Sequence, residues 1–212
     1  MLILASASPR RRDLLAQAGY QFEAISADVS EDVRPGETPI PYVLRLAREK
    51  AEAVAASPKF RALSQHQDHP PLILGADTTV VAPSGQILGK PEDDADAARI
   101  LRLLFGATHQ VITGIALLVP RDEHPITEVA AEVTHVTMLT PTDAELDAYI
   151  ATGEPRGKAG AYAIQGQAAR WIPRIHGCYF NVVGLPISLV ASMIEGVQAR
   201  LGLDITLQVT DP

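Results

Sequence analysis

The feature that most constrains the fold is an apolar run, Leu72 to Ala82, that is interrupted by one carboxylate, Asp77. A run of this length and composition is typical of a buried strand. Ser84-Gly85 and a second apolar stretch, Ile87-Leu88, follow it, which predicts a hairpin. Because an unpaired carboxylate is very costly to bury, we expect Asp77 to have a charged partner, a chemical role, or both.

The register of this hairpin decides which side chains accompany Asp77. If Ser84-Gly85 is a two-residue loop, Thr79 lies opposite Lys90 and Asp77 lies opposite Glu92. Alternation then places these side chains on one face, with Lys90 within reach of Asp77. Two carboxylates beside a lysine can hold a divalent cation, orient water and neutralise phosphate. A structural Asp77–Lys90 ion pair, with Glu92 in solvent, explains the same pattern equally well.

Strand and helix patterns alternate along the rest of the chain. Strands are predicted at Leu2–Ala5, Phe22–Ser26, Val111–Val119 and Val129–Leu139, the last two around a polar turn near Arg121–Pro125. Helices are predicted from Pro9 to about Ala18, from Thr38 to about Ala56, and over Asp93–Phe105, Asp143–Ala151 and Pro186–Leu201. The polar segment Ser57–Pro71 is expected to be an exposed connection. The order predicts one α/β domain over residues 1–212, bordering on α+β, with a mixed sheet.

Composition and charge limit the partners. The 212 residues carry a formal net charge of -7, so we expect binding to neither nucleic acid nor an anionic membrane. The single cysteine, Cys178, cannot form an internal disulfide, which favours the cytoplasm. The apolar start is too short for a signal peptide, and no stretch reaches the length of a transmembrane helix. Any phosphate ligand must therefore meet a local basic site.

A candidate for that basic site is the turn before the first helix. Arg10, Arg11 and Arg12 stand in the first helical turn, where the helix dipole already presents positive charge. With Ser6 and Ser8, their guanidinium groups and the free backbone N–H groups form a phosphate cradle. The alternative is that the three arginines simply extend into water. Electrostatic repulsion among three cations in the first helical turn favours the anion site over this alternative.

A second candidate is the glycine-rich segment Glu154–Gly166. Its glycines allow the backbone to approach a ligand closely, Lys158 supplies charge, and the amide of Gln165 can read the edge of a base. The segment matches neither a Walker nor a Rossmann phosphate motif. His109, His135 and His176 lack the spacing of metal ligands, so we expect them to be exposed or satisfied within the fold.

Five segments carry a joint pattern: Ser6-Ala-Ser-Pro-Arg-Arg11, Gly75-Ala-Asp-Thr-Thr-Val80, Gly89-Lys-Pro91, Lys158-Ala-Gly-Ala-Tyr-Ala-Ile-Gln-Gly166 and Val183-Gly-Leu-Pro186. In this order they resemble the Maf family of nucleotide pyrophosphatases, and the resemblance extends from Leu4 to about Ile194. It implies a fold similar to the inosine triphosphatases, with an elongated mixed sheet, flanking helices and two lobes around a cleft. It also implies a homodimer and a divalent cation, Mg²⁺ or Mn²⁺, in the hydrolysis of a nucleoside triphosphate to its monophosphate and pyrophosphate.

The resemblance also implies roles for individual residues. Asp77 matches the proposed proton acceptor, and Glu31 matches an acidic position near metal or water, so both are candidate metal ligands. Residues that match substrate-binding positions are Ser8, Arg10, Arg11, Lys50, Thr78, Lys90, Lys158 and Gln165. Whether Asp77 acts as general base or as metal ligand stays open, because both roles need the same carboxylate.

The form Ile164-Gln165-Gly166 resembles the branch that acts on dTTP and UTP. A pyrimidine O4 and N3–H ask for one donor and one acceptor, which the amide of Gln165 provides. One alternative is the same reaction on 7-methyl-GTP or a noncanonical purine nucleotide, where an acidic residue suits this region. The other is a noncatalytic nucleotide-binding regulator of septum formation. The presence of Asp77, Lys90 and Glu31 favours an enzyme.

Overall fold

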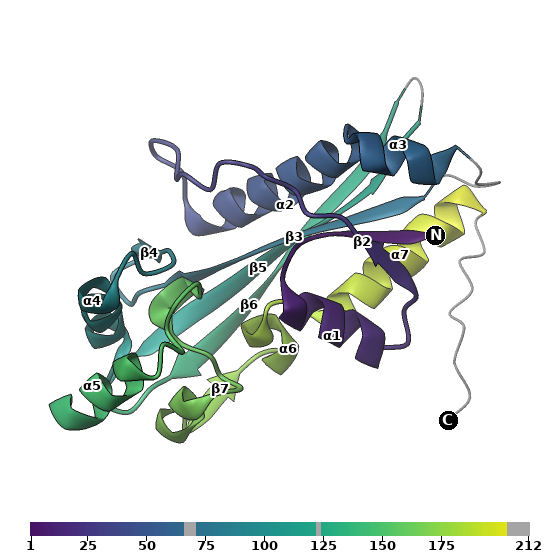
Figure 1. Ribbon diagram of the computed structural model, residues 1–212. Helices are drawn as coiled ribbons and strands as arrows, with labels where there is room; N and C mark the ends of the chain where they lie inside the picture. The colour runs from purple at the N-terminus through teal and green to yellow at the C-terminus, as the bar shows by residue number, and fades with distance from the viewer. Residues whose placement is uncertain (66–70, 122–123, 203–212) are drawn as a thin grey trace. The chain divides into compact units, whose positions relative to one another are not determined.

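The computed structural model describes residues 1–65, 71–121 and 124–202. It contains a seven-stranded sheet in the order β2-β1-β3-β5-β6-β7, with β4 paired to β3. Parallel pairs join β1 to β2 and β3, and antiparallel pairs join β3 to β4 and β6 to β7. Helices flank this sheet (Figure 1). The expected α/β class with a mixed sheet is therefore confirmed.

The chain divides into two compact units. Unit 1 consists of the described residues of 1–77, 113–131 and 184–212, and unit 2 of those of 78–112 and 132–183. The long strands β3 (Leu72–Val81), β5 (Thr108–Val119) and β6 (Ile126–Thr137) each have residues in both. The expectation of a single domain over residues 1–212 stays a prediction.

Unit 1 is built on β1 (Leu2–Ala5), which lies between the parallel strands β2 (Phe22–Ala24) and β3. Its helices are α1 (Pro9–Gln17), α2 (Pro39–Ala55), α3 (Pro58–Ser64) and α7 (Ile187–Leu201). The side chain of Ser8 caps α1 by accepting from the Arg11 N–H, and proline occupies the first turn. The predicted elements here are confirmed, although β2 ends two residues before the predicted Ser26.

Helix α3 corrects the prediction of an exposed connection over Ser57–Pro71. Ser57 caps this helix by accepting from the Phe60 N–H at 3.2 Å, and Pro58 begins it. Phe60 is buried in the core of unit 1. A helix this short buries too few apolar residues to show a period, so its cap was the only local signal. Residues 66–70 of the predicted connection, and residues 122 and 123 of the predicted turn, lie outside the described residues.

The hairpin after β3 forms, but its register differs from the prediction. Strand β4 (Ile87–Leu88) pairs with β3 through Val80 opposite Leu88 and Val81 opposite Ile87. The expected pairs, Thr79 with Lys90 and Asp77 with Glu92, would require a register displaced by one residue and a longer β4. A slip of one residue moves side chains to the opposite face of a strand, so the predicted four-residue face is wrong.

The cause of the displacement is a loop of three residues where two were predicted. The Ala82 N–H donates to the carbonyl of Gln86 at 2.9 Å, which closes the hairpin around Pro83, Ser84 and Gly85. Gly85 adopts a φ of 89°, the left-handed conformation that the third residue of such a loop requires. Ser84-Gly85 therefore marks the turn correctly, but it does not reveal that Pro83 belongs to the loop.

Unit 2 contains α4 (Asp94–Leu104), α5 (Asp143–Ala151), η1 (Ala159–Ala161), η2 (Gln167–Trp171), β7 (Arg174–His176) and α6 (Tyr179–Val183). Its core includes Tyr149 and Trp171, whose rings meet edge to face at 5.3 Å. The predicted helices α4 and α5 and the two long strands are confirmed. The four short elements between Glu154 and Gly184 were not predicted, because none is long enough to show a period.

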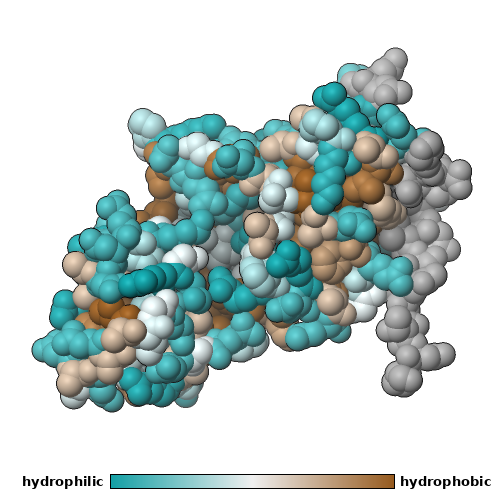
Figure 2. Space-filling model, in the orientation of Figure 1, coloured by the Kyte–Doolittle hydropathy of each residue, from teal (hydrophilic) through white to brown (hydrophobic). Residues whose placement is uncertain are grey.

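The visible surface in Figure 2 is mainly hydrophilic, with separated hydrophobic areas. Among the described residues, the large apolar side chains that are exposed include Ile40 of α2, Leu103 of α4, and Tyr179 and Phe180 of α6. Of the helices that the structure describes, none combines the length and the hydropathy needed to cross a membrane.

Candidate active site

The polar groups of unit 1 gather where β1 ends beside the middle of the longer parallel strand β3. Ala5 lies opposite Gly75 in the last pair of the β1–β3 ladder, so Ser6, the first residue after β1, and Asp77, within β3, both lie just beyond that pair. The carboxyl ends of parallel strands are where α/β proteins place their ligands. The turn into α1, which carries Ser8 and Arg11, begins at this end of β1.

Lys50 of α2 is the partner that the buried Asp77 requires. The Lys50 ammonium donates to Asp77 Oδ1 at 2.6 Å and to Glu31 Oε1 at 2.8 Å. Asp77 is 6% exposed and Lys50 9% exposed, so water screens their ion pair poorly. Lys50 was expected here only from the family resemblance, whereas hairpin geometry pointed to Lys90. The structure thus joins three of the expected site residues, Glu31, Lys50 and Asp77, in one hydrogen-bonded group.

Burial sets the acidity of Asp77. Desolvation raises the pKa of this carboxyl above its ordinary value, while the charges of Lys50 and Arg11 oppose the shift. A carboxylate with a raised pKa is a better proton acceptor than a solvated aspartate. The surroundings of Asp77 therefore suit a group that takes a proton from water.

Arg11 supports the site from within the fold. Its Nε donates to the carbonyl of Gly184 at 2.8 Å, and its Nη1 donates to the carbonyl of Ala76 at 3.0 Å and to Ser6 Oγ at 3.2 Å. The residue is only 9% exposed, and burial lowers the pKa of its guanidinium. Arg11 thus connects the β1–α1 turn, the middle of β3 and the chain before α7.

The three consecutive arginines have unequal environments. Arg11 is buried, Arg10 is half-buried and Arg12 is exposed. The prediction treated them as one cationic cluster in the first turn of α1. The structure instead separates a bracing arginine from two that have access to solvent, and of these Arg10 is the less exposed.

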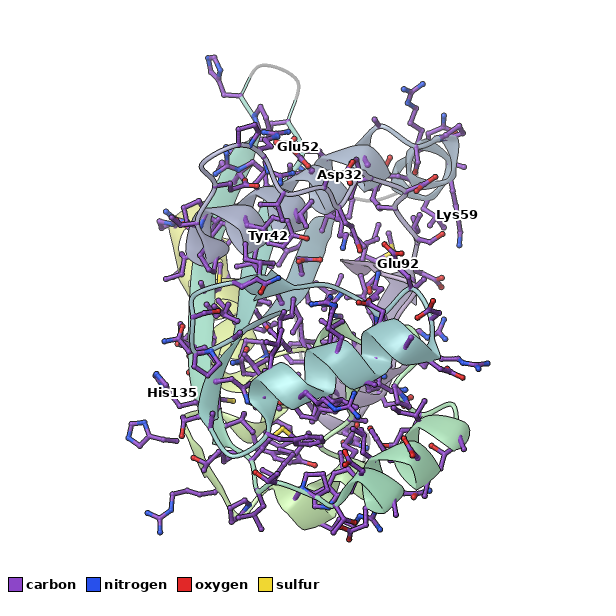
Figure 3. The ribbon with its side chains drawn as sticks, turned by 90° about the vertical axis from the view of Figure 1, so that its left-hand side faces the viewer. Asp32, Tyr42, Glu52, Lys59, Glu92 and His135 are labelled. Atoms are coloured by element: carbon purple, nitrogen blue, oxygen red, sulfur yellow. The ribbon has the colours of Figure 1, made fainter. Side chains whose placement is uncertain are left out.

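Sequence reasoning missed the residues of α2 that hold the segment around Glu31. The Tyr42 hydroxyl donates to the carbonyl of Glu31 at 2.8 Å, and Arg45 Nη2 donates to the carbonyl of Asp32 at 3.0 Å. Figure 3 labels Tyr42 and Asp32 in this region. Burial raises the pKa of Tyr42 to about 12, which keeps its hydroxyl protonated and able to donate. Neither contact had a signal in the sequence, because both end on backbone carbonyls.

Arg45 also forms a forked ion pair. Its Nε and Nη2 donate to the two carboxylate oxygens of Glu37, each at 2.6 Å. Glu37 Oε2 additionally accepts from the Arg34 N–H at 3.0 Å. These bonds hold the pKa of Glu37 at about 2, chiefly through the bond from Arg45. The segment that presents Glu31 is therefore attached to the same helix that presents Lys50.

The remaining expected site residues belong to unit 2. Thr78, the residue after Asp77, is half-buried, and Lys90, two residues after β4, is exposed. The Gly160 N–H donates to the carbonyl of Gly89 at 3.1 Å, so the Gly89-Lys90-Pro91 segment lies beside η1. Glu92 is exposed and its N–H donates to Asp96 at the start of α4, which replaces the predicted position opposite Asp77.

The glycine-rich segment carries an exposed glutamine, Gln165, just before its last residue. The Lys158 ammonium donates to the carbonyl of Glu154, and Gln165 is exposed to solvent. Tyr162, between them, is buried and its hydroxyl lies 2.8 Å from His109 Nε2. Burial lowers the pKa of His109 to about 4, so this imidazole is neutral near pH 7. The prediction that the histidines are satisfied or exposed is confirmed for His135 (Figure 3) and His176, which are exposed. It is only half right for His109, whose Nδ1 is buried without a hydrogen-bond partner among the described residues.

The chemistry of Glu31 and Asp77 fits a divalent cation. Within the described ranges, no group of three or more His, Cys, Asp or Glu side chains is placed to hold a metal ion. The Lys50 ammonium donates to one oxygen of each carboxylate, so the two acids lie beside the same cation. Mg²⁺ typically uses one or two carboxylates together with phosphate oxygens and water. The two acids can thus supply the protein's share of such a site.

Comparisons with known proteins identify the family of the chain. Residues 1–197 match the family described as Maf-like protein. The chain is 46% identical over 198 residues to a dTTP/UTP pyrophosphatase of Geobacter sulfurreducens, covering 93% of this chain and 97% of the relative. Proteins with the same name from Koribacter versatilis and Cupriavidus pinatubonensis are 49% and 45% identical, covering 92% and 94% of this chain and 93% and 97% of the relatives. The chain therefore belongs to the Maf-like protein family.

Proposed function

We propose that this protein is a nucleoside triphosphate pyrophosphatase that hydrolyses dTTP and UTP to the monophosphate and pyrophosphate. The observation that carries the proposal is the group Glu31–Lys50–Asp77, in which one buried ammonium joins two carboxylates beside the end of β1. Relatives that are 45–49% identical over most of their length bear the name dTTP/UTP pyrophosphatase. The activity and the substrates follow from these two lines of support together.

In the proposed reaction, Asp77 accepts a proton from water as the water oxygen attacks the α-phosphorus. The bond from the α-phosphorus to the oxygen bridging to the β-phosphorus breaks, and pyrophosphate leaves. Lys50 keeps the carboxylates of Asp77 and Glu31 in place and supplies positive charge near the polyphosphate. Mg²⁺ or Mn²⁺ held by Asp77 and Glu31 would neutralise phosphate charge and lower the pKa of water. The same carboxylate can serve as base or as ligand.

Binding of the polyphosphate is assigned to the remaining basic and hydroxyl groups. Ser8 and Arg10 at the start of α1 offer hydroxyl and guanidinium donors, and Arg11, whose guanidinium braces the fold, adds positive charge behind them. Lys90 and Lys158 add charge, and Thr78 adds a hydroxyl. Gln165 recognises the pyrimidine, because its amide both donates and accepts.

The test is pyrophosphate release from a panel of dTTP, UTP, CTP, GTP and 7-methyl-GTP by wild-type protein and by Asp77→Asn. We expect preference for dTTP and UTP in the wild type and a loss of about a thousandfold or more in kcat for Asp77→Asn. Asp147→Asn, which changes an exposed acid on α5, is the control. Near-normal turnover by folded Asp77→Asn would refute the role of Asp77. A preference for 7-methyl-GTP would refute the proposed substrates.

We further propose that the protein acts in the cytoplasm as a homodimer. A chain with one cysteine needs no oxidising compartment for its folding. Light scattering coupled to size-exclusion chromatography would measure the molar mass, and a value near 22.7 kDa, that of a single chain, would contradict the dimer.

A further inference from the structure

Glu154 holds the glycine-rich segment at two points. Its Oε2 accepts from the backbone N–H of Gln167 at 3.0 Å, just beyond Gln165. Its Oε1 accepts from the Tyr149 hydroxyl at 2.9 Å, which ties the carboxylate to α5. Its backbone carbonyl accepts from the Lys158 ammonium. One residue therefore contacts the segment at Lys158 and again after Gln165.

The carboxylate also occupies the space beside Gly166. A Cβ added to Gly166 would lie 2.3 Å from Glu154 Oε1 and 2.5 Å from Oε2. Any side chain at position 166 must therefore displace this carboxylate. The Gly166 N–H donates to the carbonyl of Ala163 at 3.0 Å, so Gln165 lies within a tight turn. The Glu154 carboxylate lies against Gly166, the last residue of this turn.

We propose that Glu154 is a positioning residue that orients Gln165 and thereby sets the preference for a pyrimidine base. Glu154 has no role in the proposed hydrolysis itself. The inference rests on the proposal that the protein hydrolyses dTTP and UTP. A carboxylate accepts at both oxygens, so it can fix a hydroxyl and a backbone N–H simultaneously. Without it, the turn loses its contact with α5, and the Gln165 amide no longer meets the base at a fixed angle.

The principal test compares Glu154→Ala with Glu154→Gln. We expect Glu154→Ala to reduce the ratio of kcat/KM for dTTP over CTP by about tenfold, the effect of misaligning one hydrogen-bonding side chain. The loss should appear mainly in KM for dTTP, while inhibition by pyrophosphate stays within about twofold, because pyrophosphate carries no base. Glu154→Gln should retain most of the discrimination, since its oxygen can accept from Gln167 while its amide donates to Tyr149.

Gly166→Ala tests the same contact from the other side. The added methyl group must push the Glu154 carboxylate away, so the variant should lose dTTP discrimination to a similar extent. In the double variant with Glu154→Ala, the three atoms that lie nearest to this methyl group are absent. Its discrimination should therefore equal that of Glu154→Ala alone. Additive losses would overturn the inference.

Trp171 provides a readout without substrate. It is the only tryptophan of the chain, it ends the η2 helix that begins at Gln167, and it packs on Tyr149. We expect the emission of Trp171 to shift in Glu154→Ala and to return towards wild type in Glu154→Gln. Asp147→Ala, on the exposed side of α5, should leave both emission and discrimination unchanged.

The outcomes separate the two proposals. A wild-type protein with no preference for dTTP and UTP would overturn the proposed function, and the inference with it. A normal preference that survives in Glu154→Ala would overturn the inference alone. An equal loss for every nucleotide and for pyrophosphate inhibition, together with a lower melting temperature, would assign Glu154 a purely structural role and also overturn it.

Discussion

The Lys50 ammonium lies 2.6 Å from Asp77 Oδ1, and both residues are buried. The two charges come from different elements, the helix α2 and the strand β3. Gly75, two residues before Asp77, brings that strand close to the backbone of α2. The ion pair is thus a consequence of helix–strand packing as well as of charge.

Removal of the Lys50 charge should move the pH dependence of catalysis. Lys50→Met takes away a cation that opposes the raised pKa of Asp77, so that pKa rises further. A higher pH is then needed to deprotonate Asp77, and the acidic limb of kcat/KM moves upward. We also expect kcat/KM at the optimum to fall by about a hundredfold.

The control for Lys50 is Lys59→Met, which removes an exposed lysine of α3 (Figure 3). It should leave the pH profile of kcat/KM unchanged. An acidic limb at the wild-type position in Lys50→Met would show that Asp77 does not govern the reaction.

Loss of Arg11 should mainly affect the free energy of unfolding, whereas loss of Arg10 should mainly affect KM for dTTP. Arg11→Ala leaves the carbonyls of Gly184 and Ala76 without their guanidinium donor inside the protein. We expect the free energy of unfolding to fall by about 2–4 kcal/mol. Arg10→Ala, at a half-buried position, should change it by about 0.5 kcal/mol or less but raise KM for dTTP by about tenfold. Urea denaturation and initial rates measure the two effects, and equal destabilisation by both variants would contradict this division.

The strand and helix periods predicted most of the fold, and they failed where an element is short. Helix α3 buries Phe60 but is too short to show a period, and β4 is only two residues long. The register of β4 against β3 depended on whether Pro83 belongs to the loop, and the turn dipeptide Ser84-Gly85 does not decide this. A single residue of error there gave Asp77 the wrong partner across the hairpin.

The site was predictable in its residue types but not in its pairings. The costly carboxylate in an apolar run identified Asp77, and the resemblance supplied Lys50 and Glu31. The contacts of Tyr42 with Glu31 and of Arg45 with Asp32 were not predicted, because both end on backbone carbonyls. A carbonyl is present at every residue and leaves no trace in the sequence.

The Arg45–Glu37 ion pair should make stability depend on pH in acid. Its bonds hold the pKa of Glu37 at about 2, below the ordinary value of 4.5. A carboxyl with a lowered folded pKa contributes stability above its unfolded pKa and loses that contribution as the pH falls through the folded pKa. The wild type should therefore exceed Glu37→Gln in free energy of unfolding near pH 6, and the difference should shrink between about pH 4.5 and pH 2.

Urea denaturation at a series of pH values measures this difference. Glu52→Gln, at an exposed position of α2 labelled in Figure 3, is the matched control and should differ from wild type by a small, constant amount. A Glu37→Gln difference that stays constant down to pH 2 would mean that the ion pair contributes nothing through the charge of Glu37.

Two glycines of unit 1 should respond to alanine in opposite ways. A Cβ on Gly75 would lie 2.0 Å from the carbonyl oxygen of Ala47, a backbone atom that cannot move without shifting α2. We expect Gly75→Ala to lower the free energy of unfolding by about 3 kcal/mol or more, and to lower kcat by separating Lys50 from Asp77. Gly196, inside α7, has nothing within 4 Å of an added Cβ, so Gly196→Ala should raise stability by up to about 1 kcal/mol. Thermal unfolding and pyrophosphate release measure both variants, and a Gly75→Ala protein with wild-type melting temperature and turnover would show that the approach of β3 to α2 does not position the ion pair.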